Sequence, residues 1–521
     1  MYAMTAEELI AAWGDVFWTW AVLPVVVVLG VYLTVRSGAV QIRLLPEMFR
    51  TLTDKTPRDE DGRPQSVSSF QAFTISAASR VGTGNIAGVG TAIAVGGPGA
   101  VFWMWLMACI GAASAFLEST LAQLYKTRDA NGFRGGPAYY MARGLGARWA
   151  GVLFSVILLV CFPFAFSSLQ ANTIAIAADT AIGVLTGRDE TAAWLPAVIG
   201  VAVATLTALI VFGGVRRIAH VTQALVPVMA LAYLLVGLAV VAVHIERLPA
   251  VAASIFTQAF GPNEVLGATL GYIVLTGVKR GMFSNEAGLG SAPNAGASAA
   301  VTHPVKQGLV QSLGVYFDTL LVCSITAFTI LVAVPDLADA PSGLELTQTA
   351  LSGSLGAWSL VALAVIVFML AFSSIIGNYY YGEANLEFIS TSPRVLAGYR
   401  VLVVAAVLAG SVLSAGVVWA FADAVMGVMA LTNLIALALL SGVGFRLLKD
   451  YTAQRRQGRD PVFTRDWMPD LRGVECWADE ASVTGVIDIA AARHQAAKHR
   501  DHLHGAPDPG MADLGPARDT E

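Results

Sequence analysis

Charge is scarce in this sequence. Of its 521 residues only 13% are Asp, Glu, Lys or Arg, whereas 56% are hydrophobic, and the mean hydropathy is +0.65. Soluble domains typically carry about a quarter charged residues, so this composition excludes a soluble globular protein and predicts a chain that crosses a membrane many times. The formal net charge of −4 gives no information about binding partners, and we expect no nucleic acid among them. In a membrane protein the positions of Lys and Arg are informative, whereas the net charge is not.

Cysteines and catalytic motifs are also few. The four cysteines, Cys109, Cys161, Cys323 and Cys476, show no metal-ligand spacing, and the first three lie in apolar runs where small buried side chains are expected. No pairing of a nucleophile with a base is visible, so we expect neither an enzyme nor an organic cofactor. The N-terminus lacks the basic region and cleavage site of a signal peptide, so the first apolar run is expected to be a retained helix.

Long apolar runs predict eleven membrane-spanning segments. These segments are 16–35, 69–95, 100–124, 150–178, 193–212, 217–243, 265–297, 307–333, 357–381, 396–415 and 417–446. The loops that alternate to one side hold most of the Lys and Arg, whereas the opposite loops hold only Arg188 and Arg247. Because basic loops stay in the cytoplasm, we expect a multi-pass protein of the cell membrane with its N-terminus outside and its C-terminus in the cytoplasm.

Two of these spans contain polar, glycine-rich stretches that an intact helix in lipid would not contain. They are Ser79–Gly88 and Arg280–Gly288, and they align without a gap, so that Arg80 matches Arg280 and Asn85 matches Asn285. Non-helical backbone survives at membrane depth only where it is buried in protein or lines a wet cavity. Interrupted helices at corresponding places in two halves are typical of secondary transporters built from inverted repeats.

The predicted fold is therefore an all-α membrane protein with one N-terminal helix followed by two inverted five-helix repeats, the first helix of each repeat being broken. The sequence does not indicate the oligomeric state. The predicted parts are an N-terminal helix with a cytoplasmic connector (1–68), the first repeat (69–243), the second repeat (265–446) and a partly disordered cytoplasmic tail (451–521).

The first break offers groups for a zwitterion and a cation. The half-helix that restarts presents free N–H groups that suit a carboxylate, and the half that ends presents carbonyls that suit Na⁺ or an ammonium group. Gly82 and Gly84 allow a ligand to approach this backbone, and Thr83 and Asn85 add polar side chains. A simple helix contact through small residues is the alternative, but Arg80 and Asn85 would be costly there.

In the second break, Met282 and Phe283 are expected to flank a small apolar side chain, and Ser284 and Asn285 to line its polar end. Glu286 is expected to be the buried partner of Arg280 or Arg80 rather than an ion-coupling group.

Four further polar residues lie inside spans that look intact. Gln170 either faces the cavity or bonds to a neighbouring helix, and Asp318 is either paired or bound to a cation. Ser373 and Ser374 could add hydroxyl oxygens to a cation site, although serines in membrane helices more often bond to their own carbonyls.

Three stretches resemble the signature of a known family. They are Ser76–Val89, Gly132–Tyr140 and Gly277–Gly288, and they are similar to motifs of the alanine or glycine:cation symporters, also called sodium:alanine symporters. This family belongs to the amino-acid/polyamine/organocation superfamily, whose fold is two inverted five-helix repeats. The resemblance covers about residues 15–450.

The resemblance implies roles for particular residues. Thr83, Gly84 and Asn85 would contact the carboxylate and ammonium groups of the substrate, while Gln170 and Met282 to Asn285 would form the remaining walls. Ser373 and Ser374 would bind sodium, with the carbonyls near Ser79 and Gly82 opposite.

It also implies the transported species. The substrate would be glycine or either enantiomer of alanine, imported with Na⁺ as the coupling ion. Proton-driven members of the superfamily often carry a lysine on the fifth helix of the first repeat, and span 217–243 has none at mid-depth. A proton-coupled symporter is the alternative, and a channel is a weaker one. The preferred substrate and the number of ions are not indicated.

Overall fold

The computed structural model describes residues 6–58, 63–129, 132–187, 192–260 and 268–484, so Arg188 lies outside the described residues. Within these ranges the chain is almost entirely helical, and the strands β1 (Thr127–Asp129) and β2 (Gly132–Arg134) form a small antiparallel pair. The prediction of an all-α membrane protein is confirmed.

The helices of the first half are interrupted by π-helical segments, labelled η1 to η3. In chain order the elements up to residue 243 are α1 (Ala6–Phe17), η1 (Trp18–Val22), α2 (Leu23–Arg36), α3 (Val40–Arg43), α4 (Leu45–Leu52), α5 (Ser69–Arg80), η2 (Gly84–Gly88), α6 (Val89–Gly96), α7 (Gly99–Leu124), α8 (Pro137–Gly144), α9 (Arg148–Leu159), η3 (Val160–Phe166), α10 (Ser167–Thr186), α11 (Leu195–Val211) and α12 (Gly214–Val243).

The second half repeats this pattern of long and interrupted helices. Its elements are the 3₁₀ turn η4 (Ile245–Arg247), α13 (Leu248–Thr257), α14 (Ala268–Asn285), α15 (Ala292–Ser298), α16 (Pro304–Tyr316), the π-helical η5 (Phe317–Cys323), α17 (Ser324–Ala333), α18 (Leu344–Leu355), α19 (Trp358–Ile389), α20 (Pro393–Val412), α21 (Ala415–Arg456), the 3₁₀ turn η6 (Arg465–Trp467) and α22 (Glu480–Thr484).

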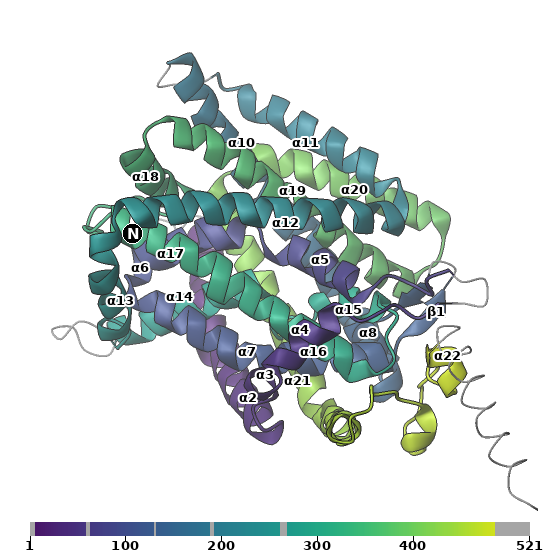
Figure 1. Ribbon diagram of the computed structural model, residues 1–521. Helices are drawn as coiled ribbons and strands as arrows, with labels where there is room; N and C mark the ends of the chain where they lie inside the picture. The colour runs from purple at the N-terminus through teal and green to yellow at the C-terminus, as the bar shows by residue number, and fades with distance from the viewer. Residues whose placement is uncertain (1–5, 59–62, 130–131, 188–191, 261–267, 485–521) are drawn as a thin grey trace, which may run out of the picture.

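Helices occupy each of the eleven predicted ranges. Among the described residues, eight helical segments are long and apolar enough to cross a membrane. The ranges 69–95 and 265–297 instead hold interrupted helices, and 193–212 holds the shorter α11. In Figure 1 the long helices run side by side across the molecule, with α13 and α18 at one end and β1, α8 and α22 at the other. The number of crossings, the inverted repeat, the domain limits and the orientation stay predictions.

Small residues set the distance between the central helices α7 and α16. A Cβ on Gly308 of α16 would overlap the Thr120 hydroxyl and lie 2.6 Å from the carbonyl oxygen of Phe116, both on α7. The Ser312 hydroxyl donates to the carbonyl of Ala112 at 2.6 Å. Because lipid gives helices no hydrophobic reason to associate, close backbone approach and buried hydrogen bonds of this kind hold the bundle together.

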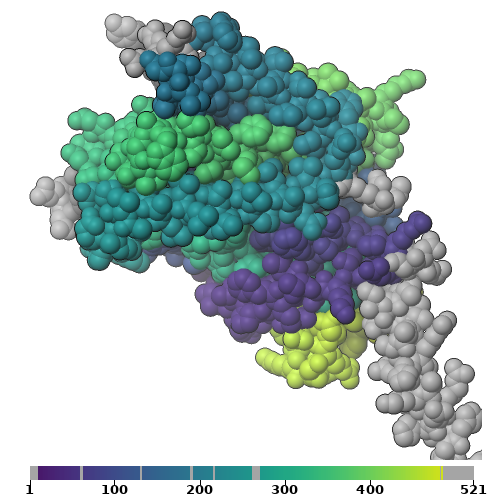
Figure 2. Space-filling view, turned by 45° about the horizontal axis from the view of Figure 1, so that its top comes forward, coloured from purple at the N-terminus to yellow at the C-terminus, as the bar shows by residue number. Residues whose placement is uncertain are grey.

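The C-terminal part of the chain is more ordered than the sequence indicates. α21 continues to Arg456, and the residues after it pack against the end of the molecule that is predicted to face the cytoplasm. Phe463 and Trp477 of this part are buried. Figure 2 shows its yellow atoms beneath the purple N-terminal segment. The remainder of the predicted tail, 485–521, lies outside the described residues.

The α7–α16 contact makes a prediction about stability. Gly308→Val should lower the unfolding free energy by about 1–3 kcal/mol, because the added atoms have no space against Thr120 and Phe116. Gly398→Val on α20 is the matched control, since a Cβ there meets nothing within 4 Å. Thermal unfolding of the purified protein in detergent measures both. Equal unfolding temperatures for the two variants would contradict the close contact.

Candidate substrate and ion site

The first helix break lies inside the predicted stretch Ser79–Gly88. α5 ends at Arg80, Val81 is extended (φ −80°, ψ 91°), and helical structure resumes at Thr83. The N–H of Gly82 donates to Asn85 Oδ1 at 2.9 Å. The N–H and the hydroxyl of Thr83 both donate to Gln170 Oε1, at 3.0 and 2.6 Å. The unwound backbone is therefore buried and held by two carboxamide side chains, one of them from α10.

The second break lies further along the chain than the sequence predicts. α14 stays helical through Asn285, and the irregular stretch runs from Glu286 to Ser291 before α15 begins. Glu286, Gly288 and Gly290 have positive φ values of 56°, 82° and 83°. The break therefore begins inside the predicted stretch Arg280–Gly288, but residues 280–285 of that stretch are helical, because the glycines that adopt the left-handed conformation follow Asn285. Met282, Phe283 and Ser284 consequently lie on the last turn of α14.

Glu118 of α7 holds the second break. Its carboxylate accepts hydrogen bonds from the N–H groups of Gly288 and Gly290, at 3.4 and 3.1 Å, and from Asn433 Nδ2 at 2.8 Å. Asn433 Nδ2 also donates to the carbonyl of Gly288 at 2.9 Å. Sequence reasoning missed Glu118, although it is the sole charged residue in the predicted span 100–124 and could have been found on that ground.

Asp318, on η5, connects the two breaks. Its carboxylate accepts from Asn85 Nδ2 of the first broken helix at 2.7 Å, from Ser284 Oγ of the second at 2.8 Å and from Thr319 Oγ1 at 3.0 Å. These partners are neutral, and among the described residues no basic side chain lies within ion-pair distance of Asp318. The structure thus shows Asp318 paired with neutral side chains, and the alternative of a bound cation stays a prediction.

Glu286 has hydroxyl partners instead of the predicted arginine. Its carboxylate accepts from Ser79 Oγ at 2.8 Å and from Ser291 Oγ at 2.6 Å. Arg280 instead pairs with Asp423, at 3.1 and 2.5 Å, and Arg80 donates to the carbonyl of Gln311 at 3.1 Å. The predicted direct ion pair of Glu286 with either arginine is wrong. Glu286 joins the end of α5 to the start of α15.

Five oxygen atoms converge beside the first break. Ser373 Oγ lies 3.4 Å from the carbonyl oxygen of Ala78 and 2.8 Å from that of Leu370. Ser374 Oγ lies 3.4 Å from the carbonyl oxygen of Val81 and 3.1 Å from that of Leu370. Both serines thus bond to their own helix and also face the end of α5.

The carbonyls opposite the serine pair belong to the residues next to Ser79 and Gly82. Those of Ala78 and Val81 face the hydroxyls, each one position before the predicted Ser79 and Gly82. The hydroxyl of Ser79 points elsewhere and donates to Asn378 Oδ1 at 2.8 Å as well as to Glu286. Gly82 nevertheless approaches the same place, because a Cβ on it would overlap Ser374 Oγ.

Three aromatic rings pack together beside Gly84. The ring of Phe283 lies 4.7 Å from that of Phe166 and 5.0 Å from that of Trp419, and a Cβ on Gly84 would come within 2.8 Å of the Phe283 ring. Phe166 and Trp419 were not predicted, since single aromatic residues in apolar spans carry no distinguishing signal.

Two predicted wall residues have mainly structural contacts. Met282 is buried in the hydrophobic core. The side chain of Asn285 donates to Thr319 Oγ1 at 3.1 Å and accepts from the N–H of Ala287 at 3.0 Å, so it shapes the second break.

A cavity is present on each side of the two breaks. One, of about 230 Å³, is lined by charged residues that include Asp15, Lys279 and Asp423, and by Trp419. The other, of about 650 Å³, lies at the predicted cytoplasmic end and is lined by parts of α5, α12, α15 and α19. The polar cluster therefore lies between two cavities that face opposite ends of the helices.

The comparisons with known proteins agree with this arrangement. A sequence model of the sodium:alanine symporter family matches residues 3–465. The chain belongs to this family. Its members are transporters, so the protein is a membrane transporter for a small amino-acid substrate and not an enzyme.

Relatives of known name cover nearly the whole chain. The amino-acid carrier protein AlsT of Bacillus subtilis is 50% identical over 90% of this chain and 97% of its own length, and the probable sodium/glutamine symporter GlnT of the same organism is 46% identical over 90% and 96%. Among solved structures, MhsT in complex with L-phenylalanine is 13% identical with a TM-score of 0.54, over 85% of this chain and 100% of MhsT. The last similarity shows a shared fold.

The contacts of Glu118 generate a prediction. Glu118→Gln should lower the unfolding free energy by about 1–3 kcal/mol, because an amide nitrogen would replace one of the two oxygens that accept from Gly288 and Gly290. Glu345→Gln, at an exposed position, is the control. Thermal unfolding in detergent provides the measurement. Wild-type stability of the Glu118 variant would show that the carboxylate does not hold the second break.

Proposed function

We propose that this protein imports alanine or glycine together with Na⁺ by alternating access between the two sides of the cell membrane. The observation that carries this proposal is the group of five oxygens formed by Ser373, Ser374 and the carbonyls of Ala78, Val81 and Leu370. Unwound carbonyls and hydroxyls of this kind suit Na⁺ at the midplane of a transporter. The family description, which names sodium and alanine, supports the same ion and substrate.

The carboxylate of the substrate would bind at Thr83. Its N–H and hydroxyl converge on one oxygen atom of Gln170, which is the arrangement that a carboxylate oxygen requires. An arriving carboxylate would displace Gln170 and take over both hydrogen bonds. Gly82 and Gly84 have no side chains, so Ser374 and Phe283 pack closely against this backbone. Asn85 fixes the conformation of Gly82 on which this geometry depends.

The aromatic rings favour a small side chain. Phe283 lies close to Gly84 and is backed by Phe166 and Trp419, so a substrate beside Gly84 meets ring faces within a short distance. The name of GlnT makes glutamine the competing substrate. Glutamine has four non-hydrogen atoms beyond its Cβ, which alanine lacks, and the rings would have to turn to admit them.

Asp318 supports the alternative of proton coupling. It is a buried carboxylate with neutral partners on both broken helices, so gain of a proton or approach of a cation would change its hydrogen bonds to Asn85 and Ser284. The serine pair, by contrast, offers oxygen atoms without a titratable group. Sodium binding at the serines and proton binding at Asp318 therefore predict different dependences of transport on Na⁺ and on pH.

Uptake of radiolabelled alanine into proteoliposomes tests the proposed function. With Na⁺ outside, we expect saturable uptake that collapses when K⁺ replaces Na⁺ and that excess glycine inhibits more strongly than glutamine, because of the ring contacts described above. Undiminished uptake driven by a pH gradient without Na⁺ would show that protons are the coupling ion. Stronger inhibition by glutamine than by glycine would contradict the preference for a small substrate.

The serine pair generates a separate prediction. The double variant Ser373→Ala and Ser374→Ala should raise the Na⁺ concentration for half-maximal uptake by roughly tenfold or more, since removing two ligands of a cation costs at least about 1.5 kcal/mol. Ser441→Ala is the control, because this hydroxyl bonds only to its own helix, at the carbonyl of Ala438. An unchanged Na⁺ dependence in the double variant would remove the serines from the ion site.

A further inference from the structure

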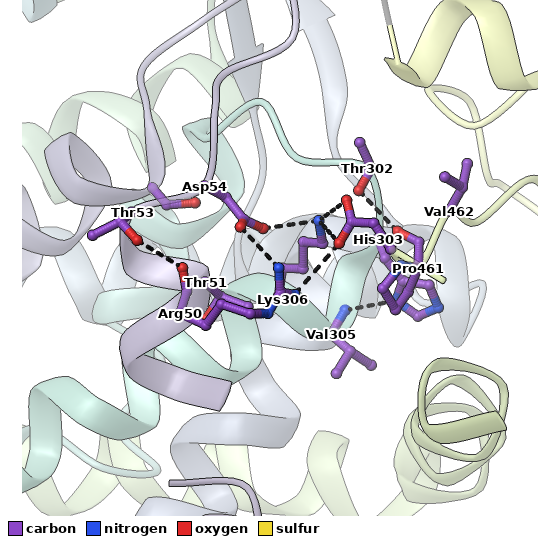
Figure 3. Close-up of polar contacts among 12 residues, drawn as sticks. Arg50, Thr51, Thr53, Asp54, Thr302, His303, Val305, Lys306, Pro461 and Val462 are labelled. Carbon is purple, nitrogen blue, oxygen red and sulfur yellow. Dashed lines mark hydrogen bonds and ion pairs between the residues drawn. The ribbon is translucent and has the colours of Figure 1, made fainter. Parts of the chain in front are cut away.

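The chain after α21 forms a strap, defined here as Asp460–Trp477, across the predicted cytoplasmic ends of several helices. Its first anchor is Lys306 at the start of α16, a buried ammonium that lies 2.8 Å from a carboxylate oxygen of Asp460 and 2.8 Å from one of Asp54. Figure 3 shows Asp54 and Lys306 pointing toward each other beside this part of the strap. Lys306 of α16 therefore links the strap to the segment that follows α4.

Backbone hydrogen bonds continue this first anchor. The N–H of Phe463 donates to the carbonyl of Thr302 at 2.9 Å, and the hydroxyl of Thr302 donates to the carbonyl of Pro461 at 2.8 Å. Figure 3 shows Thr302 and Pro461 on either side of this contact. The ring of Phe463 then packs against His303 on one side and Trp477 on the other, with centroids 5.7 Å apart in both cases.

Trp477 is the second anchor. Its indole N–H donates to the carbonyl of Gln123, at the end of α7, at 3.1 Å. Its ring lies 4.7 Å from the ammonium of Lys126, whose other side faces the ring of Phe133 at 3.9 Å. Burial lowers the pKa of Lys126 to about 7. The two aromatic rings and the carbonyl of Ala299 lie within contact of its ammonium group.

Lys126 and Gln123 hold the last turn of α15. Lys126 Nζ donates to the carbonyl of Ala299 at 3.1 Å, and Gln123 Nε2 donates to those of Gly296 and Ala299 at 2.6 and 2.9 Å. The next residue, Ala300, donates its N–H to the carbonyl of Val67 at 3.0 Å, just before α5. The contacts therefore run from the strap through α7 to the paired cytoplasmic ends of both broken helices.

These paired ends form one wall of the 650 Å³ cavity. Val67, Gln71 and Ser298 of these ends line the cavity together with Ala219, His220 and Ala384 of α12 and α19. Opening a path from the break to the cytoplasm requires the two walls to separate. If the start of α5 and the end of α15 move together, Lys126 and Trp477 must move with them. Otherwise the contact of Lys126 with Ala299 and that of Trp477 with Lys126 must break.

We propose that the strap restrains opening at the cytoplasmic side, with Trp477 as the positioning residue that keeps Lys126 on the end of α15. The proposal rests on the alternating access of the proposed function and adds a regulatory contact to it. The match to the family covers residues 3–465, so Trp477 lies outside the matched part of the chain. Release of the strap would shift the protein toward states open to the cytoplasm.

Cysteine accessibility tests this restraint. In a background in which the four native cysteines are replaced by serine, Ala384→Cys reports on the cytoplasmic-side cavity and Thr91→Cys on the opposite cavity. Each probe is combined with Trp477→Ala or with Trp467→Ala. Trp467 is the matched control because it belongs to the same strap but is 66% exposed, whereas Trp477 is 1% exposed.

We expect Trp477→Ala to raise the maleimide labelling rate at position 384 several-fold and to lower it at position 91, with Trp467→Ala unchanged at both. Trp477→Phe, which keeps a ring face for Lys126, should restore most of the wild-type rates. Equal rates for the two alanine variants would overturn the proposal, and so would a parallel increase at both probes, which indicates general loosening. Labelling requires no substrate, so failure of alanine transport would leave this result interpretable.

Discussion

The structure depends on giving a hydrogen-bond partner to each backbone group that two broken helices expose inside the membrane. An unsatisfied N–H or C=O in hydrocarbon costs several kcal/mol, so the breaks can exist only where other helices supply partners. Gln170 and Asn85 serve the first break, and Glu118 serves the second. This requirement explains why a chain with so few polar residues in its spans concentrates them around positions 80–86 and 286–291.

The same partners make the site responsive to ligands. In the proposed function, a substrate carboxylate that replaced Gln170 on Thr83 would release a contact between α10 and the first broken helix. A change at Asp318 alters contacts to both broken helices at once. In the proposed function, binding at the centre would therefore act on both broken helices at once.

Much of the site could be predicted because polar residues are conspicuous in apolar spans. The density of glycine, arginine and asparagine located the first break, and Thr83, Gln170, Ser373 and Ser374 do lie together in the structure. The second break begins later than the start of its predicted stretch. The alignment with the first stretch identifies corresponding residues, but it does not show which glycines adopt a positive φ. The opposing carbonyls could be placed only near Ser79 and Gly82, because tertiary contacts decide which carbonyls at a break face the serines.

Other features carried no such signal. The choice of Asp423 as the partner of Arg280, and of Ser79 and Ser291 as partners of Glu286, follows from how distant helices meet. Trp419 and Phe166 look like ordinary apolar residues until Phe283 is found between them. The order in the strap depends on Lys126 and Lys306, which are far away in sequence. Partners of this kind become visible only in three dimensions.

The most direct test of this account is an experimental structure of the protein determined in the presence of Na⁺ and alanine. The account predicts the carboxylate of alanine on the N–H and hydroxyl of Thr83, with Gln170 displaced, and a sodium ion among the oxygens of Ala78, Val81, Ser373 and Ser374. Alanine bound elsewhere, with the contact between Thr83 and Gln170 intact, would contradict it.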